Sequence, residues 1–174
     1  MSKIDNDFLK GGIIKEVVKG LLQRYGYEVY PYGYETTFSA LKSKLQAEGV
    51  KTSPSVRRMK STPDLVVFDQ KKKDLMLVEV KMRTSLPVTI NANTIQGYKD
   101  FWNDCILVLV VPDENVFYAQ RVSDLQIKEK YNPVTDFYGI REFFQDIDEC
   151  EFLDYKTLTK NLLLNLRQMK SRRY

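Results

Sequence analysis

Three charged residues interrupt two short apolar runs between residues 61 and 83, and their types could hold a metal ion. Asp64 opens the first run, and Glu79 and Lys81 interrupt the second. Residues two apart in a strand share a face, so Glu79 and Lys81 should point the same way. The turn-like segment 70–73 predicts that the runs pair as a β-hairpin. That pairing would bring Asp64 beside the other two side chains.

Two clustered carboxylates suggest a hard cation between them. Without a positive charge nearby they would repel each other and raise each other's pKa. Mg²⁺ takes oxygen ligands, often one or two carboxylates together with waters and a substrate phosphate. A lysine beside it could orient or deprotonate an attacking water, or stabilise the charge that develops on phosphorus. The pattern therefore predicts metal-assisted hydrolysis of a phosphodiester.

A structural interpretation of the same residues stays open. Asp64 could be a turn residue after Pro63, and Glu79 and Lys81 an exposed ion pair on an edge strand. The chain contains an internal comparison, because Asp113 also follows a proline after an apolar run. No acidic residue and lysine follow it on a partner strand, so we interpret Asp113 as turn chemistry.

Composition narrows the chemistry further. The chain has no histidine, and its two cysteines, Cys105 and Cys150, lie far apart. Cys/His zinc sites and histidine-dependent nucleophiles are therefore excluded, and we expect no organic cofactor. A net charge of +4 permits a nucleic-acid partner without requiring one. No apolar run approaches the roughly 18 residues of a membrane span, and residues 1–12 lack an apolar signal-peptide core. We expect a cytoplasmic protein without a membrane partner.

Hydrophobic periodicity predicts an α/β domain. Apolar residues recur at helical spacing over 11–25, and strands are expected over 27–35, 64–69, 74–83, 105–111 and 116–122. A helix is expected over 36–50. The segment 86–104 should start irregular and become helical from about residue 93, and the C-terminal third should form one or two helices. Residues 51–63 are polar and basic and are predicted to form a loop. This order favours a mixed sheet with helices packed on its faces.

The segments Pro63-Asp64 and Glu79-Val80-Lys81 resemble the motif of the PD-(D/E)XK nuclease superfamily, which has the restriction-endonuclease-like fold. The helix and strand over 11–33 also resemble the opening of that family. The resemblance covers about residues 11–120, and its nearest relatives are archaeal Holliday-junction resolvases and Mrr-type nucleases. It implies a single domain over 1–174 with an αβββαβ core, an insertion over about 36–62 and a C-terminal helical extension over about 136–174.

The resemblance also implies roles for individual residues. Asp64, Glu79 and the backbone carbonyl of Val80 would bind the metal, Lys81 would be the catalytic lysine, and Glu16 matches a helix glutamate that some subfamilies use to position the metal. Gln96 and Tyr98 are expected to precede the second core helix, where related nucleases often carry a Gln or a Tyr near the site, although ordinary surface residues would fit equally. The full set expected to contact nucleic acid is Arg57, Arg58, Lys60, Arg83, Gln96 and Tyr98.

The function expected from the resemblance is a Mg²⁺-dependent deoxyribonuclease. It would be an endonuclease acting on DNA, structure-specific for junctions or branched DNA, with Mn²⁺ as a substitute metal. A homodimer is expected by analogy, because cutting two strands needs two sites. Two alternatives remain open: an inactive nucleic-acid-binding protein of the same fold, and an RNA-processing nuclease.

Overall fold

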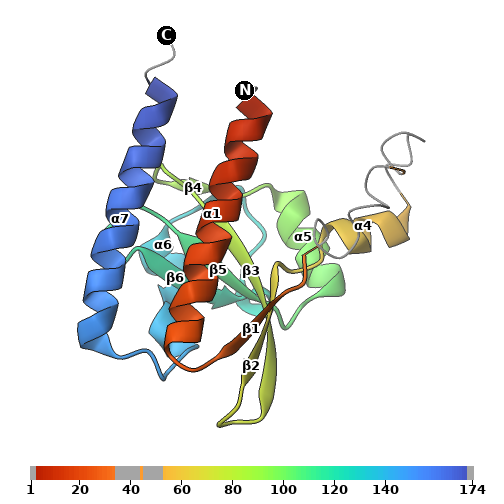
Figure 1. The fold of residues 1–174 in the computed structure, drawn as a ribbon. Coiled ribbons are helices and arrows are strands. Elements are labelled where there is room, and N and C mark those ends of the chain that lie inside the picture. Colours follow the sequence, from red (N-terminus) through yellow and green to blue (C-terminus); the bar gives the residue numbers. More distant parts are fainter. Residues whose placement is uncertain (1–2, 34–43, 45–52, 172–174) are drawn as a thin grey trace.

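A six-stranded mixed sheet forms the centre of the protein. The computed structural model describes residues 3–33, 44 and 53–171 (Figure 1). The sheet order is β1-β2-β3-β5-β6-β8, and among these only β3 and β5 run parallel. The strands are β1 (Glu28–Pro31), β2 (Leu65–Asp69), β3 (Asp74–Met82), β5 (Ile106–Val110), β6 (Phe117–Arg121) and β8 (Tyr138–Gly139). A two-stranded sheet pairs β4 (Val88–Thr89) with β7 (Lys130–Tyr131).

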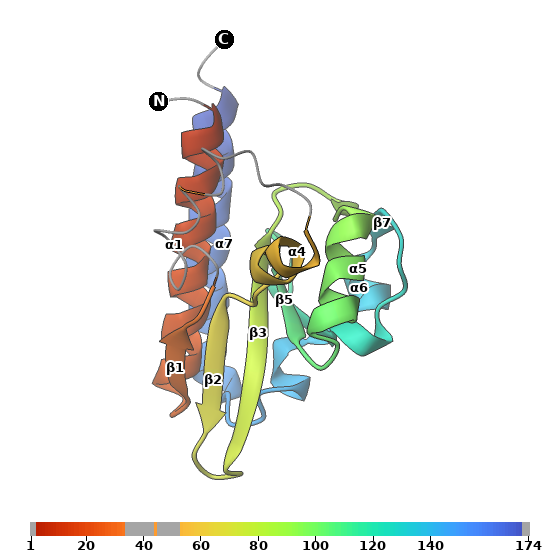
Figure 2. The same cartoon turned by 90° about the vertical axis from the view of Figure 1, so that its right-hand side faces the viewer.

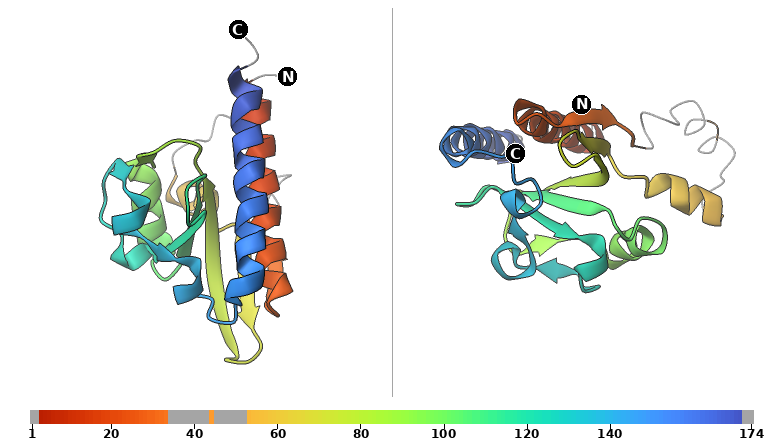
Figure 3. Two further views of the ribbon diagram at one scale, coloured as in Figure 1. Left: turned by 90° about the vertical axis from the view of Figure 1, so that its left-hand side faces the viewer. Right: turned by 90° about the horizontal axis from the view of Figure 1, so that it is seen from below.

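Helices cover both faces of this sheet. The long helices α1 (Lys3–Arg24) and α7 (Glu149–Ser171) lie side by side on one face (Figure 2). The shorter helices α5 (Ala92–Phe101) and α6 (Pro133–Asp136) lie on the other face (Figure 3). Helix α4 (Pro54–Lys60) packs beside α5, and short 3₁₀ turns cover Val122–Asp124 and Ile140–Glu142. The expected fold class, a mixed sheet flanked by helices, is confirmed.

The alternation of side chains along β3 divides the core into two parts. Val78 and Val80 are buried on the α1 face, where α1 contributes Ile14, Val18 and other apolar residues. On the α5 face, Leu107 of β5 packs with residues of α5 and the β4 segment. All five residues of β5 are buried, as expected for a strand covered on both faces. Glu79 and Lys81 belong to the α5 face, so the predicted shared face is confirmed.

Contacts between α1 and α7 fix the helical layer. The Tyr155 hydroxyl donates a hydrogen bond to the Val17 carbonyl at 2.7 Å. Gly20 allows this approach, because a Cβ there would lie 3.2 Å from the Tyr155 hydroxyl. The buried Lys10 ammonium donates to the Leu166 carbonyl at 2.8 Å. Helix α1, which carries part of the site described below, is therefore held by α7 as well as by the sheet.

Several sequence predictions need correction. The predicted loop over 51–63 contains α4, because Ser53 caps it through the Val56 amide, Pro54 occupies its first turn and Val56 is buried. The first helix begins at Lys3 rather than near residue 11, although it ends before Gly26 as predicted, where φ is +86°. The segment 139–147, predicted to be helical, begins with the last residue of β8 and forms a 3₁₀ turn over Ile140–Glu142 instead of an α-helix. The predicted helix over 36–50, and most of the insertion it belongs to, lies outside the described residues apart from residue 44.

No helix in the described ranges has the length and apolar character needed to cross a bilayer.

The buried central strand generates a stability prediction. Leu107 on β5 is fully buried, whereas Leu75 near the hairpin tip is 60% exposed. Leu107→Ala should lower the free energy of unfolding by about 2–5 kcal/mol, because it leaves a cavity between α5 and the sheet. Leu75→Ala is the matched control and should change it by less than about 0.5 kcal/mol. Urea denaturation followed by circular dichroism measures both, and equal effects would contradict the assigned core.

Candidate active site

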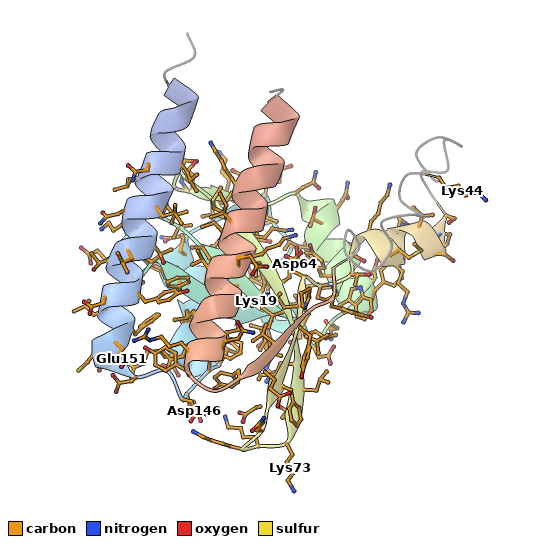
Figure 4. The ribbon with its side chains drawn as sticks, in the orientation of Figure 1. Lys19, Lys44, Asp64, Lys73, Asp146 and Glu151 are labelled. Carbon is orange, nitrogen blue, oxygen red and sulfur yellow. The ribbon has the colours of Figure 1, made fainter. Side chains whose placement is uncertain are left out.

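A cleft of about 900 Å³ opens at the end of the β2–β3 hairpin that lies away from the hairpin tip. Its walls come from α1, the end of β1, the end of α4 and the strands β2 and β3. Figure 4 shows Asp64 beside α1, at the opposite end of the hairpin from Lys73. The residues of the motif that line this cleft are Asp64, Glu79, Val80 and Lys81. The hairpin therefore brings them together, as the sequence pattern predicted.

Asp64 is held from three directions. Its Oδ2 atom accepts a hydrogen bond from the Val80 amide at 3.0 Å, which ties the start of β2 to β3. Its Oδ1 atom lies 2.6 Å from the Lys15 ammonium on α1. Its backbone carbonyl accepts from the amides of Tyr32 and Gly33, where the chain leaves β1. The carboxylate is therefore oriented by main-chain contacts and neutralised by a lysine from another element.

Glu79 is buried in the middle of the sheet with only 3% of its surface exposed. Its Oε1 atom accepts a hydrogen bond from the Tyr98 hydroxyl at 2.6 Å and also contacts the Lys81 ammonium. Tyr98 comes from α5, and Lys81 follows two residues later on the same face of β3. One carboxylate oxygen thus receives both a neutral and a charged donor.

Burial dominates the electrostatics of this group. Desolvation raises the pKa of Glu79; the Lys81 charge opposes this, and the nearby Asp64 charge adds to it. Burial also raises the pKa of Tyr98, with the Glu79 charge adding to the effect, so its hydroxyl stays protonated as a donor. Cys105 beside them has a pKa raised chiefly by burial, and its thiol is correspondingly unreactive.

The donor set fits a hard divalent cation. Among the described residues no three His, Cys, Asp or Glu side chains gather in one group, so a site built wholly from such side chains is not formed there. Two carboxylates in one cleft, together with the backbone carbonyl of Val80, which follows Glu79 in sequence, match the few protein ligands that Mg²⁺ usually takes. The ammonium group of Lys15 contacts Asp64 and that of Lys81 contacts Glu79, so each carboxylate has a positive charge beside it.

The other expected site residues are more scattered. Glu16 lines the cleft, but its side chain is 67% exposed and pairs with Lys19. Arg83 also lines the cleft, and it donates to the carbonyls of Met82 and Thr89, which fixes the chain after β3. Burial lowers its pKa. Both residues line the same cleft as the two acids.

The expected nucleic-acid contacts on α4 and α5 fall on two surfaces. Lys60 lines the cleft, whereas Arg57 lines a neighbouring groove between α4 and α5. Arg58 is exposed and stacks over the Trp102 ring, 5.6 Å from its centroid. Gln96 is exposed on α5, lines the groove and donates to Asp100. The sixth residue of that set is Tyr98, which is buried and hydrogen-bonded to Glu79.

Lys15 is the site residue that sequence reasoning missed. It precedes Glu16 on α1, and in sequence it is one more lysine on the polar side of an amphipathic helix. Its contact with Asp64 depends on how α1 packs across the sheet, which no local pattern reports. The hydrogen bond between Tyr98 and Glu79 was missed for the same reason, although both residues were singled out separately.

Asp113 behaves as its sequence context predicted. Its Oδ1 atom accepts from the amides of Asn115 and Val116, and its Oδ2 atom accepts from the Tyr118 hydroxyl. All of these partners belong to the turn and the strand that follows it, and Val116 has a positive φ of 61°. A proline and an aspartate after an apolar strand are therefore turn chemistry here, and only the convergence with Glu79 and Lys81 distinguishes Asp64.

The fold resembles a solved nuclease structure. The chain aligns with Hjc, a Holliday junction resolvase from the archaeal hyperthermophile Archaeoglobus fulgidus, with a TM-score of 0.50 and 18% sequence identity. The alignment covers 76% of this chain and 98% of that one. No family profile matches the sequence, and no curated protein shows significant sequence similarity to it. At this identity the match establishes the restriction-endonuclease-like fold, and the function must come from the site.

The raised pKa of Glu79 predicts that the ionised carboxylate, which a metal ion would need as a ligand, lowers the stability of the fold. A carboxyl whose pKa is higher in the folded state is stabilising when protonated, and stability falls as the pH rises above its unfolded value. Glu79→Gln should therefore increase the free energy of unfolding at pH 7, because it removes a buried charge. The gain should shrink as the pH falls to about 4, where the carboxyl is largely protonated even in the unfolded chain.

Denaturant titrations at pH 7 and pH 4 check this prediction. Glu114→Gln is the matched control, because Glu114 is exposed and its replacement should leave stability nearly unchanged at both pH values. A Glu79→Gln variant that is less stable than the parent at pH 7 would show that Lys81 and Tyr98 outweigh the cost of burial.

Proposed function

We propose that this chain is a Mg²⁺-dependent endonuclease that hydrolyses phosphodiester bonds in DNA, with a preference for junctions or branched structures. The observation that carries the proposal is the convergence of Asp64, Glu79 and Lys81 in one cleft of a restriction-endonuclease-like fold. The similar solved structure is a Holliday junction resolvase, which supports a substrate with branched strands.

Charge around the cleft supports a polyanionic substrate. The described residues lining it include five basic side chains and three acidic ones. The basic residues lie on α1, at the end of α4 and along the end of β3; they are Lys10, Lys15, Lys60, Lys81 and Arg83. Such an arrangement attracts the phosphate backbone, and it predicts binding that weakens as salt is added.

Each residue has a distinct task in the proposed reaction. Asp64, Glu79 and the Val80 carbonyl would hold Mg²⁺, which when bound would polarise the scissile phosphate and lower the pKa of a bound water. Lys81 points its ammonium to the same carboxylate oxygen as Tyr98, and it would orient the attacking water or donate to the phosphate. Tyr98 keeps Glu79 in position, and Lys15 does the same for Asp64. Glu16 at the rim is available to position water.

The cleavage reaction should depend on the three motif residues. Asp64→Asn, Glu79→Gln and Lys81→Ala should each lower the single-turnover rate on DNA by at least about a hundredfold, because each removes a metal ligand or the charge beside it. Asp113→Asn is the matched control, since it makes the same change after the other Pro-Asp pair and should leave the rate per folded molecule unchanged. Full activity in Lys81→Ala would contradict the mechanism.

A panel of labelled substrates identifies the preferred nucleic acid. Four-way junctions, flaps, duplexes, single strands and RNA are incubated with and without Mg²⁺, and products are separated on denaturing gels. Branched DNA should be cut fastest, Mn²⁺ should replace Mg²⁺, and Ca²⁺ should support binding without turnover. Cleavage of RNA alone would favour the RNA-processing alternative. Salt-sensitive binding without any cleavage would favour the inactive nucleic-acid-binding protein. A homodimer remains a prediction that sedimentation of the protein with and without a junction would test.

A further inference from the structure

A second hollow of about 520 Å³ lies between α4 and α5, next to the cleft. Lys60 and Tyr98 line both hollows, so the two lie next to each other. Gly97 faces α4 in this groove, and a Cβ there would lie 3.7 Å from the Ser61 Cβ. Gly97 adds no side chain to the space between the two helices. A substrate bound across the cleft can therefore extend into the groove.

The α4 wall of the groove is cationic. Arg57 and Lys60 lie in the last turn of α4 and are exposed. Neither forms an ion pair with a residue that the structure describes. Helix α4 itself is anchored away from the groove, through buried Val56 and through Arg58 over the Trp102 ring. The two cations, which have no ion-pair partner among the described residues, are thus carried on a fixed support that can present them to a phosphate.

The α5 wall has a different chemistry. Asn93 and Gln96 are exposed amides one turn apart, and Asp100 follows on the same side of the helix. The Gln96 amide donates to Asp100 at 2.6 Å, which leaves the second carboxylate oxygen of Asp100 and the amide oxygen of Gln96 as acceptors. The Asn93 side chain has no hydrogen-bond partner in the described part of the chain. Amides and a carboxylate are the groups that read the edges of bases.

We propose that the groove between α4 and α5 binds one unpaired nucleotide of the substrate, adjacent to the phosphate held in the cleft. Arg57 and Lys60 take its phosphate, and Asn93, Gln96 and Asp100 contact its base. The carboxylate of Asp100 repels phosphate, so the two walls fix which way the nucleotide lies. The groove has the size of a small-ligand pocket rather than of a surface for a duplex, and the Watson–Crick edge of a base is open to side chains when the base is unpaired.

This inference rests on the proposed function, and it specifies the substrate further. DNA with an unpaired nucleotide at the cut position should bind better than a continuous duplex. Cytosine and adenine carry an exocyclic amino group that can donate to Asp100, whereas the only donor of thymine, its N3–H, lies between two carbonyl oxygens that would repel the carboxylate. An unpaired dC should therefore bind better than an unpaired dT.

Fluorescence anisotropy tests the groove with Asp64→Asn as the non-cutting parent. Two DNAs of the same sequence are compared, one a continuous duplex and one with a single unpaired dC. The parent should bind the second about tenfold more tightly. Arg57→Gln and Asn93→Ala should each remove most of this preference while changing the affinity for the duplex less than about twofold. Lys73→Gln, the same charge change at the hairpin tip, should leave the preference intact.

Two results would overturn the proposal: a parent without preference for the unpaired nucleotide, or groove variants that weaken both DNAs equally. Asp100→Asn gives a further measurement, because it should abolish the preference for dC over dT without loss of fold. Since the readout is binding by a non-cutting variant, the groove is tested separately from cleavage. Absence of cleavage by the unmodified protein would contradict the proposed nuclease while leaving these binding comparisons decisive for the groove.

Discussion

Strand β3 is hydrogen-bonded to a neighbour on each side, β2 and β5, and side chains pack against both of its faces. Any side chain in its middle therefore lies inside the molecule. Glu79 is an ionisable residue in this position, and a buried charge is unfavourable unless donors surround it. Lys81 and Tyr98 supply those donors, yet burial still raises the pKa of Glu79. An apolar residue would suit the strand better, which is why a chemical role explains Glu79 more readily than a structural one.

The rest of the site depends on the same strand. The Val80 amide, next to Glu79 in sequence, donates to Asp64 and so fixes the distance between the two acids. The register of the hairpin pairs Leu65 with Val78, and this brings Asp64 next to the Val80 amide. Helix α1, which packs on the sheet, contributes Lys15 as the ion-pair partner of Asp64, and α7 holds α1 in place. Glu79, Lys81 and Lys15 lie on β3 and α1, and Asp64 directly precedes β2, tied to β3 by the Val80 amide.

Local patterns were enough to predict the hairpin and its charged end. The alternation of side chains along a strand predicted that Glu79 and Lys81 share a face. An acidic residue and a lysine follow Asp64 on a partner strand but do not follow Asp113, and this difference distinguished the two Pro-Asp pairs. The same reasoning could not find Lys15, because its contact with Asp64 is set by packing between distant elements. Helix α4 was not predicted, for a different reason. Ser53 and Pro54 are a recognisable helix start, but α4 has only seven residues and too little apolar periodicity to stand out. The burial of Tyr98 also depended on how α5 docks, since its helix carries an exposed amide two residues earlier.

Helix α5 connects the two hollows through one residue. The hydroxyl of Tyr98 reaches Glu79 in the cleft, while the helical turn around it forms one wall of the groove. Any displacement of α5 would change the distance between the Tyr98 hydroxyl and the Glu79 carboxylate. That hydrogen bond favours the charged form of Glu79, so lengthening it would raise the pKa further and disfavour the ionised carboxylate. The packing of α4 against α5 and the stacking of Arg58 on Trp102 oppose such a displacement. The short helix α4 therefore supports the buried acid as well as shaping the surface beside it.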